Sequence, residues 1–138
     1  MALESSNFKE ISVPYFVCDA VIQAINDSGC SIHYYSLDRD LYPTGIESLG
    51  VQNALLYVNY FGLCDSNVKK LKGEWPADTL IIDNSQALFA EPGDVLASIY
   101  SPRKFVGVPD GGMLVTQLDV KLPEQEDQDA IGRKKHVL

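Results

Sequence analysis

The feature that most constrains the fold is a series of short apolar runs that alternate with segments of helical spacing. Residues 54–60 form a nearly continuous apolar run, as expected of a strand covered on both faces of a sheet. Residues 17–27 carry apolar side chains at helical spacing, and Gly29 stands where a helix commonly ends. Because strands that alternate with helices need crossover connections, the sequence predicts an α/β fold. We expect three layers, α/β/α, with a mostly parallel sheet.

Other strands of this sheet are predicted from β-branched and aromatic residues. A second helix is predicted from Asp65 or Ser66 to Lys72. The remaining strands are expected at residues 10–16, 31–37, 79–83, 96–100 and 113–116. Residues 54–59 and 79–83 should be the central, nearly fully buried strands.

Charge and cysteine content exclude several classes of function. The net charge of −8 disfavours general nucleic-acid binding, which needs a basic surface. The longest apolar runs are about half a membrane span, and no basic segment followed by an apolar stretch opens the chain. Cys18, Cys30 and Cys64 are odd in number and widely spaced, which fits neither a disulfide framework nor a zinc site. We therefore expect a cytoplasmic protein with reduced thiols, no metal, no nucleic acid and no membrane partner.

Polar residues that close a predicted strand are the first candidates for a site, because ligands of open α/β sheets bind beyond the carboxyl ends of the strands. Asp83 ends the apolar run of residues 79–83, and Gln86 follows three residues later. One interpretation is a helix N-cap at Asp83, with Gln86 completing a capping box. The other is a buried carboxylate that pairs with a cationic ligand.

A second candidate segment, SPRKFVGVPDGG at residues 101–112, follows the next predicted strand. Its Pro-Asp-Gly sequence is ordinary turn chemistry, so a surface loop is one interpretation. The other is that Lys104 sits in a pocket, where burial or a nearby cation would make its amine nucleophilic.

Taken together, the two segments resemble a known family. The pattern D-x-x-Q from Asp83, followed by S-x-x-K-x6-G-G from Ser101, resembles the DegT-like pyridoxal-phosphate-dependent sugar aminotransferases, of the aspartate-aminotransferase fold type. Three further stretches resemble family segments in the same order: VPYF at 13–16, SLDRDLY at 36–42 and YVNYFG at 57–62. The resemblance covers about residues 10–118.

The resemblance implies roles for four residues. Lys104 would bind pyridoxal phosphate covalently and would move a proton at the substrate carbon as general base and acid. Asp83 would pair with the pyridine nitrogen, Gln86 would lie near the phenolic oxygen, and Ser101 would reach the phosphate. The fold would be the large domain of the fold-type-I pyridoxal-phosphate enzymes, and the protein would be a homodimer.

Some family features have no counterpart in this sequence. Cys18 stands where many relatives carry an aromatic residue that stacks on the cofactor, although Tyr15 or Phe16 could take that place. Asn59 stands where histidine is common, and the phosphate-binding segment has no counterpart before Glu10. We expect a truncated cofactor-binding large-domain core at 1–118 and an acidic then basic tail or helix at 119–138. The small C-terminal domain is expected to be absent.

Three functions remain open on this basis. The first is a transaminase domain of nucleotide-sugar or polysaccharide biosynthesis, weakly active or inactive alone, that would use a keto-sugar nucleotide and an amino-acid amino donor. The second is a catalytically inactive binding or assembly module of the same fold. The third is a flavodoxin-like ligand-binding domain in which Lys104 has no role.

Overall fold

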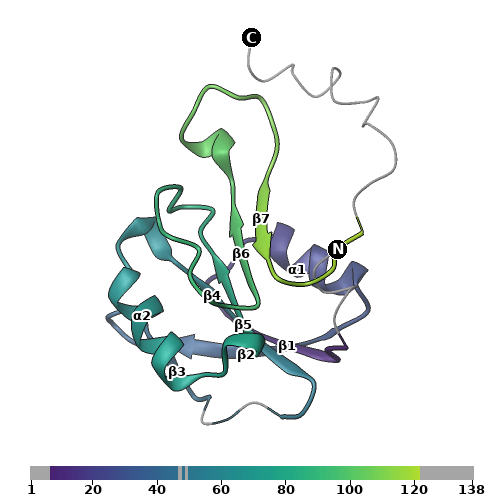
Figure 1. Ribbon diagram of the computed structural model, residues 1–138. Coiled ribbons are helices and arrows are strands. Elements are labelled where there is room, and N and C mark those ends of the chain that lie inside the picture. The colour runs from purple at the N-terminus through teal and green to yellow at the C-terminus, as the bar shows by residue number, and fades with distance from the viewer. Residues whose placement is uncertain (1–6, 47, 49, 122–138) are drawn as a thin grey trace.

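The computed structural model describes residues 7–46, 48 and 50–121, and shows one seven-stranded sheet in the order β3-β2-β1-β4-β5-β6-β7 (Figure 1). The strands are β1 (Glu10–Pro14), β2 (Ser31–Leu37), β3 (Pro43–Thr44), β4 (Asn53–Val58), β5 (Leu80–Asp83), β6 (Ala97–Tyr100) and β7 (Met113–Thr116). The helices of the described residues are α1 (Asp19–Asp27) and α2 (Asp65–Glu74), with short 3-10 turns η1 (Tyr60–Gly62), η2 (Ala77–Thr79) and η3 (Pro102–Lys104).

The sheet is mostly parallel, as the sequence predicts. Strands β2, β1, β4, β5 and β6 pair in parallel, and the edge strands β3 and β7 pair antiparallel to β2 and β6. Strand β3 was not predicted, because its two residues, Pro43 and Thr44, are too few to form a pattern. The five parallel strands follow the same order as a flavodoxin-like sheet, so strand order alone does not separate that alternative.

The two helices cover opposite faces of the sheet. The chain moves from β1 to β2 in one direction along the sheet and from β4 to β5 in the other. Because parallel crossovers are right-handed, opposite directions place α1 and α2 on opposite faces (Figure 1). The predicted three-layer α/β/α arrangement is confirmed (Figure 1).

The core is centred on β4 and β5. Five of the six residues of β4 and all four of β5 are buried, which confirms their prediction as central strands. Burial of each large apolar side chain stabilises the fold by about 1.5–3 kcal/mol. Tyr35 and Tyr57 are also buried, and their hydroxyls donate hydrogen bonds to the carbonyls of Leu56 (2.8 Å) and Leu41 (2.9 Å).

Helix α1 ends as its sequence indicates and begins two residues later than predicted. Gly29 has a left-handed backbone (φ 79°), the conformation that favours glycine after a helix. At the other end, Cys18 is extended (φ −78°, ψ 150°), so Val17 and Cys18 continue from β1 and reach the carboxyl edge of the sheet. This late start is what brings Cys18 to the candidate site described below.

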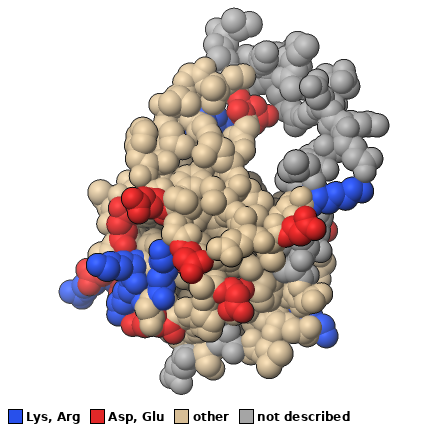
Figure 2. All heavy atoms as spheres, in the orientation of Figure 1, with Lys and Arg blue, Asp and Glu red and all other residues tan. Residues whose placement is uncertain are grey.

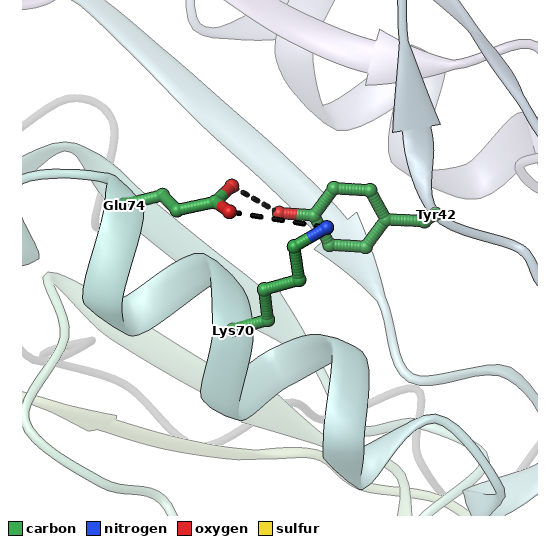
Figure 3. A network of polar contacts seen from close by, with 3 residues as sticks. All are labelled: Tyr42, Lys70 and Glu74. Atoms are coloured by element: carbon green, nitrogen blue, oxygen red, sulfur yellow. Dashed lines mark hydrogen bonds and ion pairs between the residues drawn. The ribbon is translucent and has the colours of Figure 1, made fainter.

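The loop after β2 docks on α2 (Figure 3). The Tyr42 hydroxyl donates a hydrogen bond to Glu74 (2.5 Å), and the Lys70 ammonium lies 3.8 Å from the centre of the Tyr42 ring. Asn67 of the same helix donates a hydrogen bond to the carbonyl of Asp40 (2.8 Å). These contacts fix the SLDRDLY stretch against α2 rather than at the cavity described below.

Most of the predicted tail, 119–138, lies outside the described residues. Within the described part, no helix has the length and apolar character that crossing a membrane requires. All three cysteines are free thiols: Cys18 is exposed, and Cys30 and Cys64 are buried.

Candidate active site

A cavity of about 200 Å³ lies at the carboxyl ends of the central strands. The chain leaves β1 and β4 in opposite directions, so this edge is the switch point at which open α/β sheets bind ligands. Four separate segments line the cavity: Phe16, Val17 and Cys18 after β1, Val58 and Tyr60 at β4, Asp83, Ser85 and Gln86 at β5, and Lys104 after β6.

Asp83 contributes a buried carboxylate to this cavity. The residue is only 5% exposed, because it is the last residue of the central strand β5. Its side chain accepts a hydrogen bond from the Ser85 backbone N–H (2.8 Å), and no described lysine or arginine forms an ion pair with it. A buried carboxylate is costly without a cationic partner, so this wall of the cavity favours a cation.

The helix N-cap interpretation of Asp83 is wrong. No helix follows β5 among residues 84–96, all of which the structure describes. Asp83 instead closes a turn through Ser85, and the Asp83 carbonyl accepts a hydrogen bond from the Asn59 backbone N–H (2.9 Å). In a turn of this kind and in a helix N-cap alike, the side chain accepts a hydrogen bond from a backbone N–H a few residues later. The sequence pattern therefore did not distinguish the two structures.

Gln86 lines the same cavity but is held by a different partner. Its side-chain oxygen accepts a hydrogen bond from the backbone N–H of Phe61 (3.1 Å). The turn after β4 therefore sets the orientation of a side chain that follows β5.

Lys104 is the cationic side chain of the cavity lining. It is the last residue of η3, and its backbone N–H donates to the Ser101 carbonyl (3.2 Å). Its residue is exposed, and no described residue accepts a hydrogen bond from its ammonium group. Ser101, predicted to join this site, precedes η3 and is not among the described residues that line the cavity.

Aromatic side chains form one wall. The Phe16 and Tyr60 rings stack at 5.3 Å and 5°, and the Tyr60 hydroxyl donates to the Phe16 carbonyl (2.7 Å). Burial raises the pKa of Tyr60, and the nearby Cys64 thiol and Asp83 carboxylate raise it further, so Tyr60 stays a neutral donor. Tyr15 is not among the residues that line the cavity, and its ring stacks on Tyr34 at 5.0 Å.

Sequence reasoning missed Val17, Val58, Tyr60 and Ser85 as lining residues. The place of Tyr60 directly after a buried strand could have identified it as a lining residue. The preceding residue, Asn59, was singled out from the sequence instead. Asn59 is 1% exposed and donates hydrogen bonds to Asp65 (2.8 Å) and Asn84 (3.1 Å), so it organises the end of β4 rather than the cavity.

Charge elsewhere is mixed. Figure 2 shows basic side chains gathered over α2 with acidic groups among them, and the lysines of this helix are Lys69, Lys70 and Lys72. In the described part of the chain, no three histidine, cysteine or acidic side chains are grouped to hold a metal.

Comparison with known proteins identifies the fold. No protein-family model matches the chain, and no curated protein matches its sequence. Among solved structures, PseC of Helicobacter pylori, an aminotransferase of pseudoaminic acid biosynthesis, is 19% identical with a TM-score of 0.62, over 97% of this chain and 39% of PseC. The sugar aminotransferase CalS13 of Micromonospora echinospora is 16% identical with a TM-score of 0.58, over 96% of this chain and 40% of CalS13.

A third match was solved in its PLP form. It is Spr1654 of Streptococcus pneumoniae, 14% identical with a TM-score of 0.62, over 96% of this chain and 40% of Spr1654. The chain therefore spans about two fifths of the length of the structures it matches. The predicted resemblance to DegT-like sugar aminotransferases is confirmed at the level of fold.

Proposed function

We propose that this chain is the pyridoxal-phosphate-binding core of a sugar aminotransferase large domain, with residues 1–118 as the core and 119–138 as a tail. Lys104 would hold the cofactor covalently, Asp83 would pair with its ring nitrogen, and Gln86 would contact its phenolic oxygen. The observation that carries the proposal is that Asp83 and Gln86, at the end of β5, line one cavity together with Lys104, which follows β6.

The chemistry of the lining supports this ligand. Asp83 is a buried carboxylate without a described cationic partner, which suits a protonated ring nitrogen. Lys104 supplies a primary amine, the group that reacts with an aldehyde. The stacked rings of Phe16 and Tyr60 supply a flat apolar wall against which a heterocycle can pack.

Each residue would then have a defined task. Pyridoxal phosphate, when bound, supplies an electron sink that stabilises negative charge on a substrate carbon. The Asp83 carboxylate would hold a proton on the ring nitrogen. The Lys104 amine would take a proton from the substrate carbon and return one, as general base and acid.

The finer assignment is also a proposal. A keto-sugar nucleotide and an amino-acid donor are the proposed substrates, since CalS13 is described as a sugar aminotransferase and PseC as an aminotransferase of pseudoaminic acid biosynthesis. A homodimer in the cytoplasm is the proposed state.

Borohydride trapping tests cofactor attachment. The chain is mixed with pyridoxal phosphate, reduced with borohydride, digested and mapped by mass spectrometry. We expect label on Lys104 above every other lysine, and its loss in Asp83→Ala. Asp110→Ala, which removes an exposed carboxylate from the segment between β6 and β7 that also carries Lys104, is the matched control and should label normally. Equal labelling of all lysines would overturn the proposal.

The phosphate group should contribute little to binding. Ser101 is not in the described cavity lining, and charge-assisted hydrogen bonds contribute about 1.5–3 kcal/mol each. A phosphate that lacks one such bond binds roughly tenfold more weakly or worse, and one that lacks two binds roughly a hundredfold more weakly or worse. We therefore expect weak, partial loading, and labelling by pyridoxal within about tenfold of that by pyridoxal phosphate. A preference of a hundredfold for the phosphate form would show a phosphate site that the cavity lining does not include.

An inactive binding or assembly module is the second candidate. Its support is the size of the cavity, about 200 Å³, which is below the roughly 300–1,000 Å³ of typical ligand pockets. Large apolar side chains are also exposed, among them Leu63 (81%) and Phe89 (87%). Self-association with no Lys104 labelling would favour this candidate, and size-exclusion chromatography with light scattering measures the association.

A further inference from the structure

The turn after β4 has an unusual backbone. Phe61 has a left-handed conformation (φ 56°, ψ 11°), and Gly62 follows with φ 69°. Left-handed backbone is common for glycine but a clear outlier for a bulky residue such as phenylalanine. The Phe61 side chain is 63% exposed, so packing of its ring in the core does not account for the conformation. Strained backbone of this kind persists where surrounding contacts determine it.

Those contacts come from the segment after β5. The Phe61 backbone N–H donates to the side-chain oxygen of Gln86 (3.1 Å). A Cβ atom added to Gly62 would lie 3.3 Å from the Gln86 carbonyl oxygen and 3.7 Å from Ala87. Turn η1 is therefore packed closely against Gln86, and the left-handed pair Phe61–Gly62 permits this approach.

The hydrogen bond fixes which end of the Gln86 carboxamide is engaged within the protein and which end is left for a ligand. A backbone N–H can only donate, so the group that it meets is the carboxamide oxygen. The remaining end is the –NH2 group, which can only donate. Since Gln86 lines the cavity, this –NH2 group is the end of its side chain that could bond a ligand there, and it would do so as a donor.

We infer that Phe61 is a positioning residue: its peptide N–H holds the Gln86 oxygen, so that the Gln86 –NH2 group donates to an oxygen acceptor of the ligand. The identity of the ligand rests on the proposed function, in which that acceptor is the phenolic oxygen of pyridoxal phosphate. Donation to this oxygen favours its ionised form and lowers its pKa.

The test uses the pyridoxyl group that borohydride reduction attaches permanently to Lys104. Its phenolic ionisation is followed by absorbance against pH, and exchange of the Phe61 amide hydrogen is followed by NMR on the 15N-labelled chain. We expect Gly62→Ala to raise the phenolic midpoint by about one pH unit, a tenfold change, and to speed Phe61 exchange at least tenfold.

Gly29→Ala is the matched control. Gly29 is also left-handed (φ 79°), but nothing lies within 4 Å of a Cβ added there. It carries the same backbone strain without contact to Gln86, so the phenolic midpoint and Phe61 exchange should both stay at the original values. Gln86→Glu should keep Phe61 exchange slow, because a carboxylate also accepts from the amide, yet raise the midpoint because the donor is gone.

The outcomes separate the two proposals. Label on Lys104 with an unchanged midpoint in both Gly62→Ala and Gln86→Glu overturns the positioning role and leaves the proposed function standing. Fast exchange of Phe61 in the original chain also overturns the positioning role alone. Absence of selective label on Lys104 overturns the proposed function and, with it, the assignment of Gln86 as a donor to this ligand.

Discussion

The two walls of the cavity differ in how firmly the fold holds them. Asp83 belongs to a fully buried central strand. Its backbone carbonyl accepts a hydrogen bond from the Asn59 backbone N–H, and its carboxylate accepts one from the Ser85 backbone N–H. Lys104 lies on the arm between β6 and β7, and the residues of this arm from 103 to 108 are all exposed (Figure 1).

The charges of Asp83 and Lys104 are therefore positioned in different ways. The position of the Asp83 charge follows from the sheet itself, so it is set as soon as the fold forms. The position of Lys104 depends on local turn hydrogen bonds and on the edge contact between Phe105 and Phe89, whose ring centres are 6.3 Å apart. A ligand that bridges Asp83 and Lys104 would tie the arm to the core.

The largest expected effect is on the free energy of unfolding, and it follows from a substitution in the buried strand β5, which forms the Asp83 wall of the cavity. Ile82 is 1% exposed, so Ile82→Ala should lower the free energy of unfolding by about 2–5 kcal/mol. Val106 on the arm is 48% exposed, and Val106→Ala should change it by no more than about 0.5 kcal/mol. Urea unfolding of both variants measures the contrast. Equal effects would show that the arm is as much a part of the core as β5.

The next effect is on cofactor binding rather than on folding. Asp83→Asn keeps the side-chain shape and an acceptor for the Ser85 N–H but removes the charge. Loss of a charge-assisted bond of about 1.5–3 kcal/mol should weaken pyridoxal phosphate loading roughly 10- to 150-fold. Lys104→Arg should abolish the borohydride label and leave the urea midpoint unchanged. If Asp83→Asn loads normally, the β5 wall does not recognise the ring.

The central fold was predictable because its signals are local. The bounds of β2 and β7 follow directly from runs of β-branched and aromatic residues. The apolar run continues to Tyr60 and the strand was predicted over 54–59, but β4 ends at Val58, because Tyr60 begins the turn η1. An apolar run does not reveal that its last ring serves a cavity rather than the sheet.

The site was predictable only in part. Asp83, Gln86 and Lys104 were singled out from motif spacing, and all three line the cavity. Ser101 was singled out by the same motif but is absent from the described lining, since spacing along the chain does not say which way η3 turns. The contact between Phe61 and Gln86 joins residues 25 positions apart, and no local pattern encodes it.

A further effect is expected at alkaline pH, and it concerns three tyrosines that the fold buries. Burial raises the pKa of Tyr35, Tyr57 and Tyr60 above the value of 10 that tyrosine has in the unfolded chain. A raised pKa in the folded state means that this stability is complete below pH 10 and is lost as pH rises above it. The loss is about 1.4 kcal/mol per pH unit for each such tyrosine.

Urea unfolding between pH 7 and pH 11.5 measures this loss. Tyr60→Phe should be less stable than the original chain at pH 7, since the bond to the Phe16 carbonyl is gone. Above pH 10 its free energy of unfolding should then fall less steeply with pH. The difference in slope should correspond to about one proton, because the variant lacks one ionisable hydroxyl. Parallel pH curves for the two proteins would mean that Tyr60 does not resist ionisation.

The smallest effect is expected outside both walls, where the loop after β2 meets α2. Tyr42→Phe removes the hydrogen bond to Glu74 but keeps a ring beneath Lys70. Because the Lys70 and Glu74 side chains are 57% and 49% exposed, this contact should contribute at most about 1 kcal/mol to stability. Burial, with Glu74 adding to it, also raises the pKa of Tyr42, so the contribution should disappear above pH 10. Since Tyr42 is not part of the cavity lining, loading at Lys104 should be unchanged, and urea unfolding beside borohydride labelling checks both. A loss of loading in Tyr42→Phe would show that the loop on α2 is coupled to the cavity. Core and arm would then not be the only two parts of the chain that determine cofactor binding.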